Sequence, residues 1–135
     1  MKYNLIMNKN INGLHTENLD NGMRLETTYK DGIKYGRETY WYESGKKASE
    51  GFYENNELEG TLTYWYENGK KASAGFYEDN KLEGVLTAWN EDGLLESEQE
   101  YKNGVLNGKS IFYEDGVRVA EYFLENGEIS DNTKG

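Results

Sequence analysis

Few side chains in this sequence could carry chemistry, and their spacing argues against most enzyme reactions. His15 is the only histidine among the 135 residues, and cysteine is absent. One chain therefore cannot form a two-histidine metal site, a Ser–His or Cys–His nucleophile pair, or a thiolate metal site. We expect His15 to be a polar strand residue near the N-terminus.

Carboxylates are abundant, but none falls in the pattern of a known catalytic or metal site. Glu96, Glu98 and Glu100 alternate along one face of a predicted strand, where they could attract a cation. Like charges two residues apart are typical of a solvated face, and the spaced Asp and Asn residues of a calcium loop are missing. Lys46–Lys47 and Lys70–Lys71 follow predicted turns and should balance local charge, since no phosphate-binding GxxxxGK loop is present. We predict no metal ion, no cofactor and no enzyme activity.

Aromatic residues are the remaining candidates for a function. The chain has twelve tyrosines and three tryptophans, which are the residue types most enriched in binding hot spots. Their rings could equally be structural and need no ligand. We expect a partner-binding surface made by Tyr40, Trp41, Tyr64, Trp65, Tyr66, Trp89 and Tyr113.

A 24-residue repeat positions these rings. The period links Gly36, Gly60, Gly84 and Gly108, then Tyr29, Tyr53, Tyr77 and Tyr101, and then Trp41, Trp65, Trp89 and Tyr113. A fixed period of this length is the signature of a repeat array. Because weaker copies extend the period in both directions, we predict one array over residues 1–129, with five units and the beginning of a sixth. Residues 130–135 should form a disordered tail.

Each unit divides into two short strands separated by turn residues. In one unit the predicted strands cover about residues 60–66 and 71–78, and Asn-Gly or Asp-Gly pairs supply the positive φ angles of tight hairpin turns. The sequence therefore predicts an all-β fold, an elongated single-layer antiparallel β-meander of tandem hairpins with eleven or twelve strands. Rings one repeat apart should form rows with cross-strand aromatic pairs, and Gly51 and Gly75 should let a ring lie against the backbone.

Composition restricts the partners. The formal net charge of −10 disfavours nucleic acids and anionic membranes, whereas a basic protein would be attracted. No apolar run approaches the roughly 20 residues of a membrane span, and Met1–Ile11 contains no signal-peptide core. Together with the absence of cysteine, these features lead us to expect a cytoplasmic protein.

The repeat resembles the MORN repeat in its variant form. The motif reads Tyr29-Lys-Asp-Gly32, Gly36, Tyr40-Trp41-Tyr42 and Gly45, and it returns from Tyr101 to Gly116. Two middle units depart from it, because Asn56 and Asn80 replace a turn glycine; asparagine tolerates the left-handed φ required there. The variant repeats are also similar to those of the bacterial YwqK-type antitoxin family, which implies an immunity protein paired with a toxin.

The resemblance and the charge together predict a non-enzymatic interaction module that binds and blocks a partner toxin, for example a basic one. The alternative is a MORN-type scaffold or membrane-associated adaptor. A third interpretation is a carbohydrate binder or enzyme, with sugars stacking on the tryptophan row. Unpaired edge strands would also allow homodimerisation by edge pairing.

Overall fold

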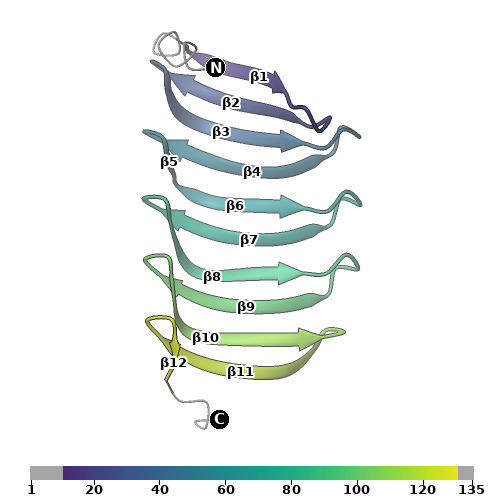
Figure 1. Cartoon of the computed structure of the whole chain (residues 1–135), viewed down its shortest axis with the longest axis vertical. Helices are drawn as coiled ribbons and strands as arrows, with labels where there is room; N and C mark the ends of the chain where they lie inside the picture. Colours follow the sequence, from purple (N-terminus) through teal and green to yellow (C-terminus); the bar gives the residue numbers. More distant parts are fainter. Residues whose placement is uncertain (1–10, 131–135) are drawn as a thin grey trace.

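The structure is a computed structural model in which residues 11–130 are described. They form a single sheet of 12 antiparallel strands (Figure 1). In chain order these are β1 Gly13–Asn18, β2 Arg24–Lys30, β3 Ile33–Trp41, β4 Lys47–Glu54, β5 Glu57–Leu58, β6 Gly60–Trp65, β7 Lys71–Glu78, β8 Lys81–Trp89, β9 Leu95–Lys102, β10 Val105–Glu114, β11 Val117–Glu125 and β12 Glu128–Ile129.

The predicted all-β meander is confirmed. Strands pair with their neighbours in chain order, except that short β5 pairs β4 beside β6. Figure 1 shows the hairpins stacked along the long axis, with no second layer on either side. The strand predicted over residues 60–66 ends one residue earlier at Trp65, and the one predicted over 71–78 matches β7. Residues 1–10 of the predicted array and the predicted tail beyond Ser130 lie outside the described residues.

Two-residue turns close the hairpins along one edge of the sheet. Asn55 and Asn56 have φ values of 50° and 67°, and Asp79 and Asn80 have 51° and 67°. Positive φ at both central residues is the geometry of a type I′ turn, whose twist matches that of the strands it joins. The expectation that asparagine would preserve these two turns without glycine is therefore confirmed.

Strand register assigns each side chain to one of two faces, because directly paired residues point the same way. We call one the Trp face, since it carries the row Trp41, Trp65, Trp89 and Tyr113. We call the other the Tyr face, with the row Tyr29, Tyr53, Tyr77 and Tyr101. The Tyr face also carries leucines that pair with these tyrosines, namely Leu58, Leu82 and Leu106.

Leucine methyl groups, rather than aromatic rings, are the closest neighbours of the two strand glycines. A Cβ atom on Gly75 would lie 2.7 Å from Leu82 Cδ1 and 3.0 Å from Leu86 Cδ1, while the nearest ring atom would be 3.9 Å away. Leu58 and Leu62 approach Gly51 in the same way. The predicted ring-on-backbone contact is thus wrong as the main contact, because leucine reaches the glycine more closely than the tyrosine ring does.

The expected aromatic pairs along the Trp row are also wrong. Residues one repeat apart are separated by two strand spacings, or about 10 Å, which is too far for direct ring contact. Lys47 fills the interval, with Nζ 5.9 Å from the centroid of Trp41 and 5.8 Å from that of Trp65. Within residues 11–130, ring pairs occur only at His15–Tyr29 and Phe112–Tyr122.

Hydrogen bonds link each hairpin to the preceding one. The Asn80 N–H donates to the Leu58 carbonyl over 3.1 Å, and Asn80 Oδ1 accepts from the Leu58 N–H at 2.7 Å. On the opposite edge, the hydroxyls of Tyr42 and Tyr66 donate to the carbonyls of Trp65 and Trp89, each over 2.5 Å. Because both edges are tied in this way, the side chains of successive units are held in a fixed register.

Candidate partner-binding surface

The seven aromatic residues predicted to bind a partner do not form one site. Trp41, Trp65, Trp89 and Tyr113 lie on the Trp face, whereas Tyr40 and Tyr64 lie on the Tyr face. Tyr66 follows β6 in a turn, where its hydroxyl is bonded to the carbonyl of Trp89. A single partner surface resting on one face cannot contact the rings of the other.

Tyr40 and Tyr64 line a hollow of about 450 Å³ on the Tyr face. The Tyr64 ring is 47% exposed, while Tyr40 is half-buried, and burial is the main cause that raises the pKa of Tyr40. Tyr42, Ala48, Ser49 and three residues around the first hairpin turn complete the lining. The hollow is largely uncharged, so its walls can accept an apolar group but offer no acid or base to act on it.

The Trp face is organised by two columns of side chains that flank its aromatic row. The column directly paired with the row, which we call the cation column, reads Arg24, Lys47, Lys71, Leu95 and Arg118. The next column, which we call the acid column, is paired with Thr39, Thr63, Thr87 and Ile111 and reads Glu26, Glu50, Ala74, Glu98 and Glu121.

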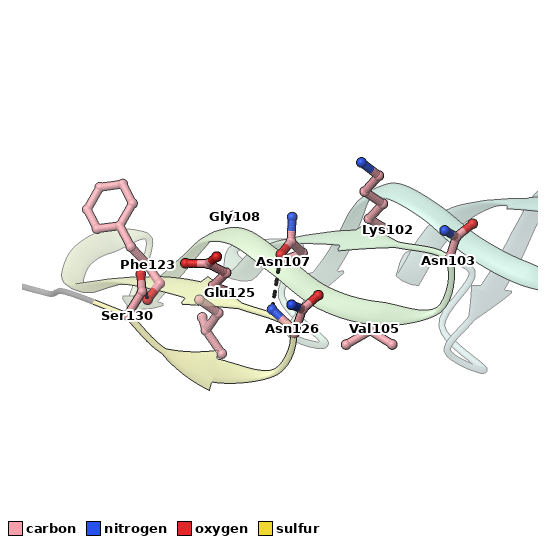
Figure 2. A pocket seen from close by; sticks show the side chains of 10 residues that line it. Lys102, Asn103, Val105, Asn107, Gly108, Phe123, Glu125, Asn126 and Ser130 are labelled. Carbon is pink, nitrogen blue, oxygen red and sulfur yellow. Dashed lines mark hydrogen bonds between the residues drawn. The ribbon is translucent and has the colours of Figure 1, made fainter.

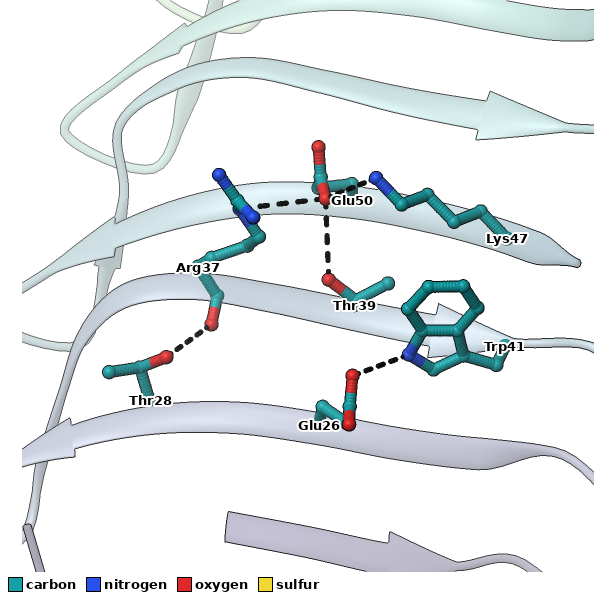
Figure 3. Close-up of polar contacts among 7 residues, drawn as sticks. All are labelled: Glu26, Thr28, Arg37, Thr39, Trp41, Lys47 and Glu50. Carbon is teal, nitrogen blue, oxygen red and sulfur yellow. Dashed lines mark hydrogen bonds and ion pairs between the residues drawn. The ribbon is translucent and has the colours of Figure 1, made fainter. Parts of the chain in front are cut away.

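In the N-terminal part of the Trp face, Glu26, Arg37, Lys47 and Glu50 have polar partners, as Figure 3 shows. Glu50 Oε2 lies 2.9 Å from Lys47 Nζ and 3.5 Å from Arg37 Nε. The Trp41 indole N–H donates to Glu26 Oε1 over 2.7 Å, and the Arg24 guanidinium lies 5.3 Å from the centre of that ring. Glu26, Arg37, Trp41, Lys47 and Glu50 line a hollow of about 330 Å³ whose charged groups already have partners. Arg24 lies outside that lining, and its buried Nε has no hydrogen-bond partner among the described residues.

Similar pairing returns at the C-terminal end. Arg118 forms an ion pair with Glu121, three residues on, as Lys47 does with Glu50. The Tyr113 hydroxyl donates to Glu98 Oε1 over 2.6 Å, and this hydrogen bond is the main cause that raises the pKa of Tyr113. Glu98 thus takes the role toward Tyr113 that Glu26 has toward Trp41.

The middle of the Trp face differs because Ala74 interrupts the acid column. Within the described residues, the indole N–H groups of Trp65 and Trp89 have no hydrogen-bond acceptor. Around them lie exposed apolar side chains, with Phe76 50% and Val85 46% exposed. We call this area of β6, β7 and β8 the central patch; it comprises Thr63, Trp65, Ala74, Phe76, Val85, Thr87 and Trp89.

Sequence reasoning missed Phe52 and Phe76 as candidate contact residues. They are 39% and 50% exposed on the Trp face, whereas the tryptophans beside them are half-buried. Their signal was present, because they are 24 residues apart and each lies between Gly and Tyr in a strand. The glycine and tyrosine of those strands face the leucines, so alternation sends both phenylalanines to the other side.

The three alternating glutamates do not form the predicted solvated stripe. Leu95 pairs Trp89 and Ser97 pairs Ala88, so a β-bulge at Glu96 takes that residue out of the alternation. Glu98 is half-buried and accepts the Tyr113 bond. Glu100, also half-buried, accepts from the Lys109 N–H over 3.2 Å. In the described part of the chain, no group of three or more His, Asp or Glu side chains could hold a metal ion.

Another hollow, of about 630 Å³, lies near the C-terminal end between successive turns (Figure 2). Its charged lining side chains are Lys102 and Glu125, and the Asn126 N–H donates to Asn107 Oδ1 over 3.0 Å beside it. The hollow therefore has no pair of carboxylates for acid/base chemistry. Its polar contacts are those that link one repeat turn to the next.

Comparison with known proteins identifies the repeat. Residues 34–55, 58–79 and 82–103 each match the family model of the MORN repeat variant. Over these three successive segments the chain is similar to the MORN repeat variant. The three matches cover all of β4, β6, β7 and β9 and most of β3 and β8, so the central patch lies entirely within the matched segments.

MORN repeats suggest a protein-interaction or scaffold role, and the exposed central patch is compatible with it. The match is to the repeat unit and gives no support to an antitoxin family in particular. No curated protein matches the chain. Among residues 11–130, no helix is long and apolar enough to span a bilayer.

Proposed function

We propose that this protein is a non-enzymatic interaction module of the immunity type, which binds and blocks a basic toxin in the cytoplasm. The supporting observation is the central patch, where two indole donors without acceptors lie among exposed apolar side chains. Lys71 lies beside Trp65 on β7, and Lys47 and Glu50 on β4 and Glu98 on β9 flank the patch on either side. An apolar centre rich in Trp within a polar rim is the usual anatomy of a binding hot spot.

The mechanism is steric occlusion aided by electrostatic attraction. The net charge of −10 steers a basic partner toward the sheet and accelerates encounter, while the central patch supplies the contacts that slow dissociation. Since binding alone inhibits the toxin, the protein needs no catalytic group.

The direct test is calorimetric titration against the product of the neighbouring gene, together with rescue of growth when both are expressed. Trp89→Ala should weaken binding by about 2 kcal/mol or more, as for a hot-spot residue. Tyr64→Ala is the matched control, because it removes an exposed ring from the opposite face. An absence of complex and of growth rescue would refute the immunity role, and equal effects of the two substitutions would refute the assignment to the Trp face.

A scaffold role is the second candidate, favoured by the exposed edge of β11, which β12 covers only at Leu124 and Glu125. Val117 and Val119 of β11 are 64% and 53% exposed, so edge pairing between two copies would cover apolar surface. Light scattering coupled to size exclusion should detect such a dimer. Co-sedimentation with anionic vesicles tests the membrane-adaptor version, and the charge of −10 leads us to expect no binding.

A further inference from the structure

The two columns of the Trp face show which charges the chain supplies for itself. Three of the five units contain both members, namely Arg24 with Glu26, Lys47 with Glu50, and Arg118 with Glu121. The second and third of these form ion pairs, whereas Glu26 accepts the Trp41 indole N–H and Arg24 lies over the Trp41 ring. In each of these units a basic side chain lies beside the aromatic row and a carboxylate lies one column away.

The two remaining units are incomplete in opposite ways. Lys71 has Ala74 in place of an acid, and Glu98 has Leu95 in place of a cation. Within residues 11–130 neither Lys71 nor Glu98 takes part in an ion pair. The unit of each residue also lacks the opposite charge in the neighbouring column. One unit therefore presents an unmatched ammonium group and the next an unmatched carboxylate.

Trp89 lies between these two charges. Its strand β8 is flanked by β7, which carries Lys71, and by β9, which carries Leu95 and Glu98. Trp41 and Tyr113 each donate a hydrogen bond to a glutamate of the preceding strand, Glu26 and Glu98 respectively. At Trp89 the equivalent residue of the preceding strand is Ala74. Basic side chains lie over the rings of Trp41 and Trp65, but within residues 11–130 none lies over Trp89.

The chain itself provides the template for a missing cation. Lys47 Nζ lies between the Trp41 and Trp65 rings and 2.9 Å from Glu50. Leu95 has the equivalent place between Trp89 and Tyr113, three residues before Glu98, but its side chain is neutral and shorter than that of lysine. The ring faces and the carboxylate that hold the Lys47 ammonium group thus recur at Leu95 without the ammonium group.

We infer that the partner supplies both missing charges. A basic side chain lies between Trp89 and Tyr113 and pairs with Glu98, and an acidic one pairs with Lys71 and accepts the Trp89 indole N–H. The two groups are about 10 Å apart, since two strand spacings separate the units. This inference rests on the proposed binding role of the Trp face and specifies the chemistry that the partner presents to it.

The test uses the three tryptophan side-chain N–H signals in a ¹H–¹⁵N spectrum of the full chain, assigned with Trp41→Phe and Trp89→Phe. The probe is the peptide acetyl-Arg-Gly-Gly-Glu-amide, whose zero net charge avoids general attraction to the acidic protein. The Trp89 signal should shift progressively with peptide, and the Trp41 signal, whose N–H and ring are already occupied, should not. Acetyl-Gln-Gly-Gly-Gln-amide should leave all three unchanged.

Substitutions then either remove a charge that binds the peptide or supply the two missing charges from the chain itself. Glu98→Gln should lower the affinity for the peptide by about twofold to fivefold, the range for an ion pair at the protein surface. The double variant Ala74→Glu/Leu95→Lys completes both columns and should abolish the Trp89 shift. Leu94→Lys is the matched control, because it adds the same charge to an exposed residue outside the row and should preserve the shift.

Two results would overturn the inference: equal shifts of all three signals, or no shift of Trp89, in the folded wild-type chain. A shift that survives in the double variant would do the same, provided that its thermal unfolding matches the wild type. The proposed function fails separately. A protein that binds the peptide at Trp89 but not the toxin loses the immunity role, whereas one that binds the toxin regardless of the double substitution loses the charge-pair assignment.

Discussion

Asn56 and Asn80 have two roles, one in the turn backbone and one as a side-chain hydrogen-bond acceptor, and glycine could fill only the first. Each adopts a left-handed φ of 67°, and each accepts a backbone N–H from the preceding hairpin through Oδ1. Glycine would keep the turn geometry but lose the side-chain acceptor, whereas alanine would lose the acceptor and also strain the backbone.

We therefore predict a graded response at Asn80. Asn80→Gly should lower the free energy of unfolding by about 0.5–1.5 kcal/mol, the usual value of one hydrogen bond. Asn80→Ala should lower it by about 1–3 kcal/mol, because left-handed strain is added. Urea denaturation of both variants gives the comparison. Equal losses would show that the turn conformation is unimportant, and no loss with glycine would exclude a stabilising role for the Oδ1 bond.

The pair formed by Lys34 and Glu38 makes stability depend on alkaline pH. Partial burial would lower the pKa of Lys34, but the hydrogen bond and charge of buried Glu38, 2.8 Å away, outweigh it and raise that pKa. Burial is the main cause that raises the pKa of the neighbouring Tyr53 as well. Both groups hold their protons more tightly in the folded chain than in the unfolded chain, so the slope of unfolding free energy with pH is negative where they titrate.

Stability should consequently be level up to about pH 9 and fall as pH rises through and above about 10, where unperturbed Tyr and Lys side chains begin to titrate. Urea denaturation at a series of pH values measures this decline. Lys34→Met removes one of the groups and should make the decline shallower. A free energy of unfolding that increased over the same range would contradict the assigned direction of the shifts.

At the scale of the hairpin, tyrosine hydroxyls connect successive units. Tyr42 and Tyr66 reach across the turn edge to the carbonyls of Trp65 and Trp89, each in the next unit. We predict that Tyr66→Phe lowers the free energy of unfolding by about 0.5–1.5 kcal/mol. Tyr35→Phe, at a ring that is exposed, should change it by less than about 0.5 kcal/mol. Thermal and urea unfolding would reveal the difference, and equal values would refute the inter-unit bond.

The hairpin is also the scale at which sequence reasoning succeeded and then failed. Period, turn pairs and alternation predicted the hairpins and their strands, because these depend on residues close in the chain. Neighbouring rings of the aromatic row are separated by two strands. The side chain beside Trp41 is therefore Lys47 rather than a second ring. The β-bulge at Glu96 and the ion pair at Glu50 likewise follow from register between strands, which the residue types alone did not predict.

For the whole molecule, the meander means that each unit contacts only its neighbours, so a local defect should stay local. Gly75→Ala would force Cβ to within 2.7 Å of Leu82 Cδ1, and overpacking of this kind costs about 1–3 kcal/mol. We predict that amide hydrogen exchange accelerates most in β6, β7 and β8 and least in β2 and β3, as nearest-neighbour coupling requires. Uniform acceleration over all the described strands would instead indicate a single cooperative unit.

The bonds between successive turns have a consequence for ancestry. On one edge of the sheet, each two-residue turn is tied to the preceding unit by the same backbone donor and acceptor, as between Asn80 and Leu58 and between Gly104 and Leu82. A gene segment encoding one such module could be duplicated or deleted in frame. The units on either side of the new junction would then present the same backbone donor and acceptor to one another. Selection could therefore lengthen or shorten the protein in steps of one module, while point changes such as those at Ala74 and Leu95 diversify what an added module recognises.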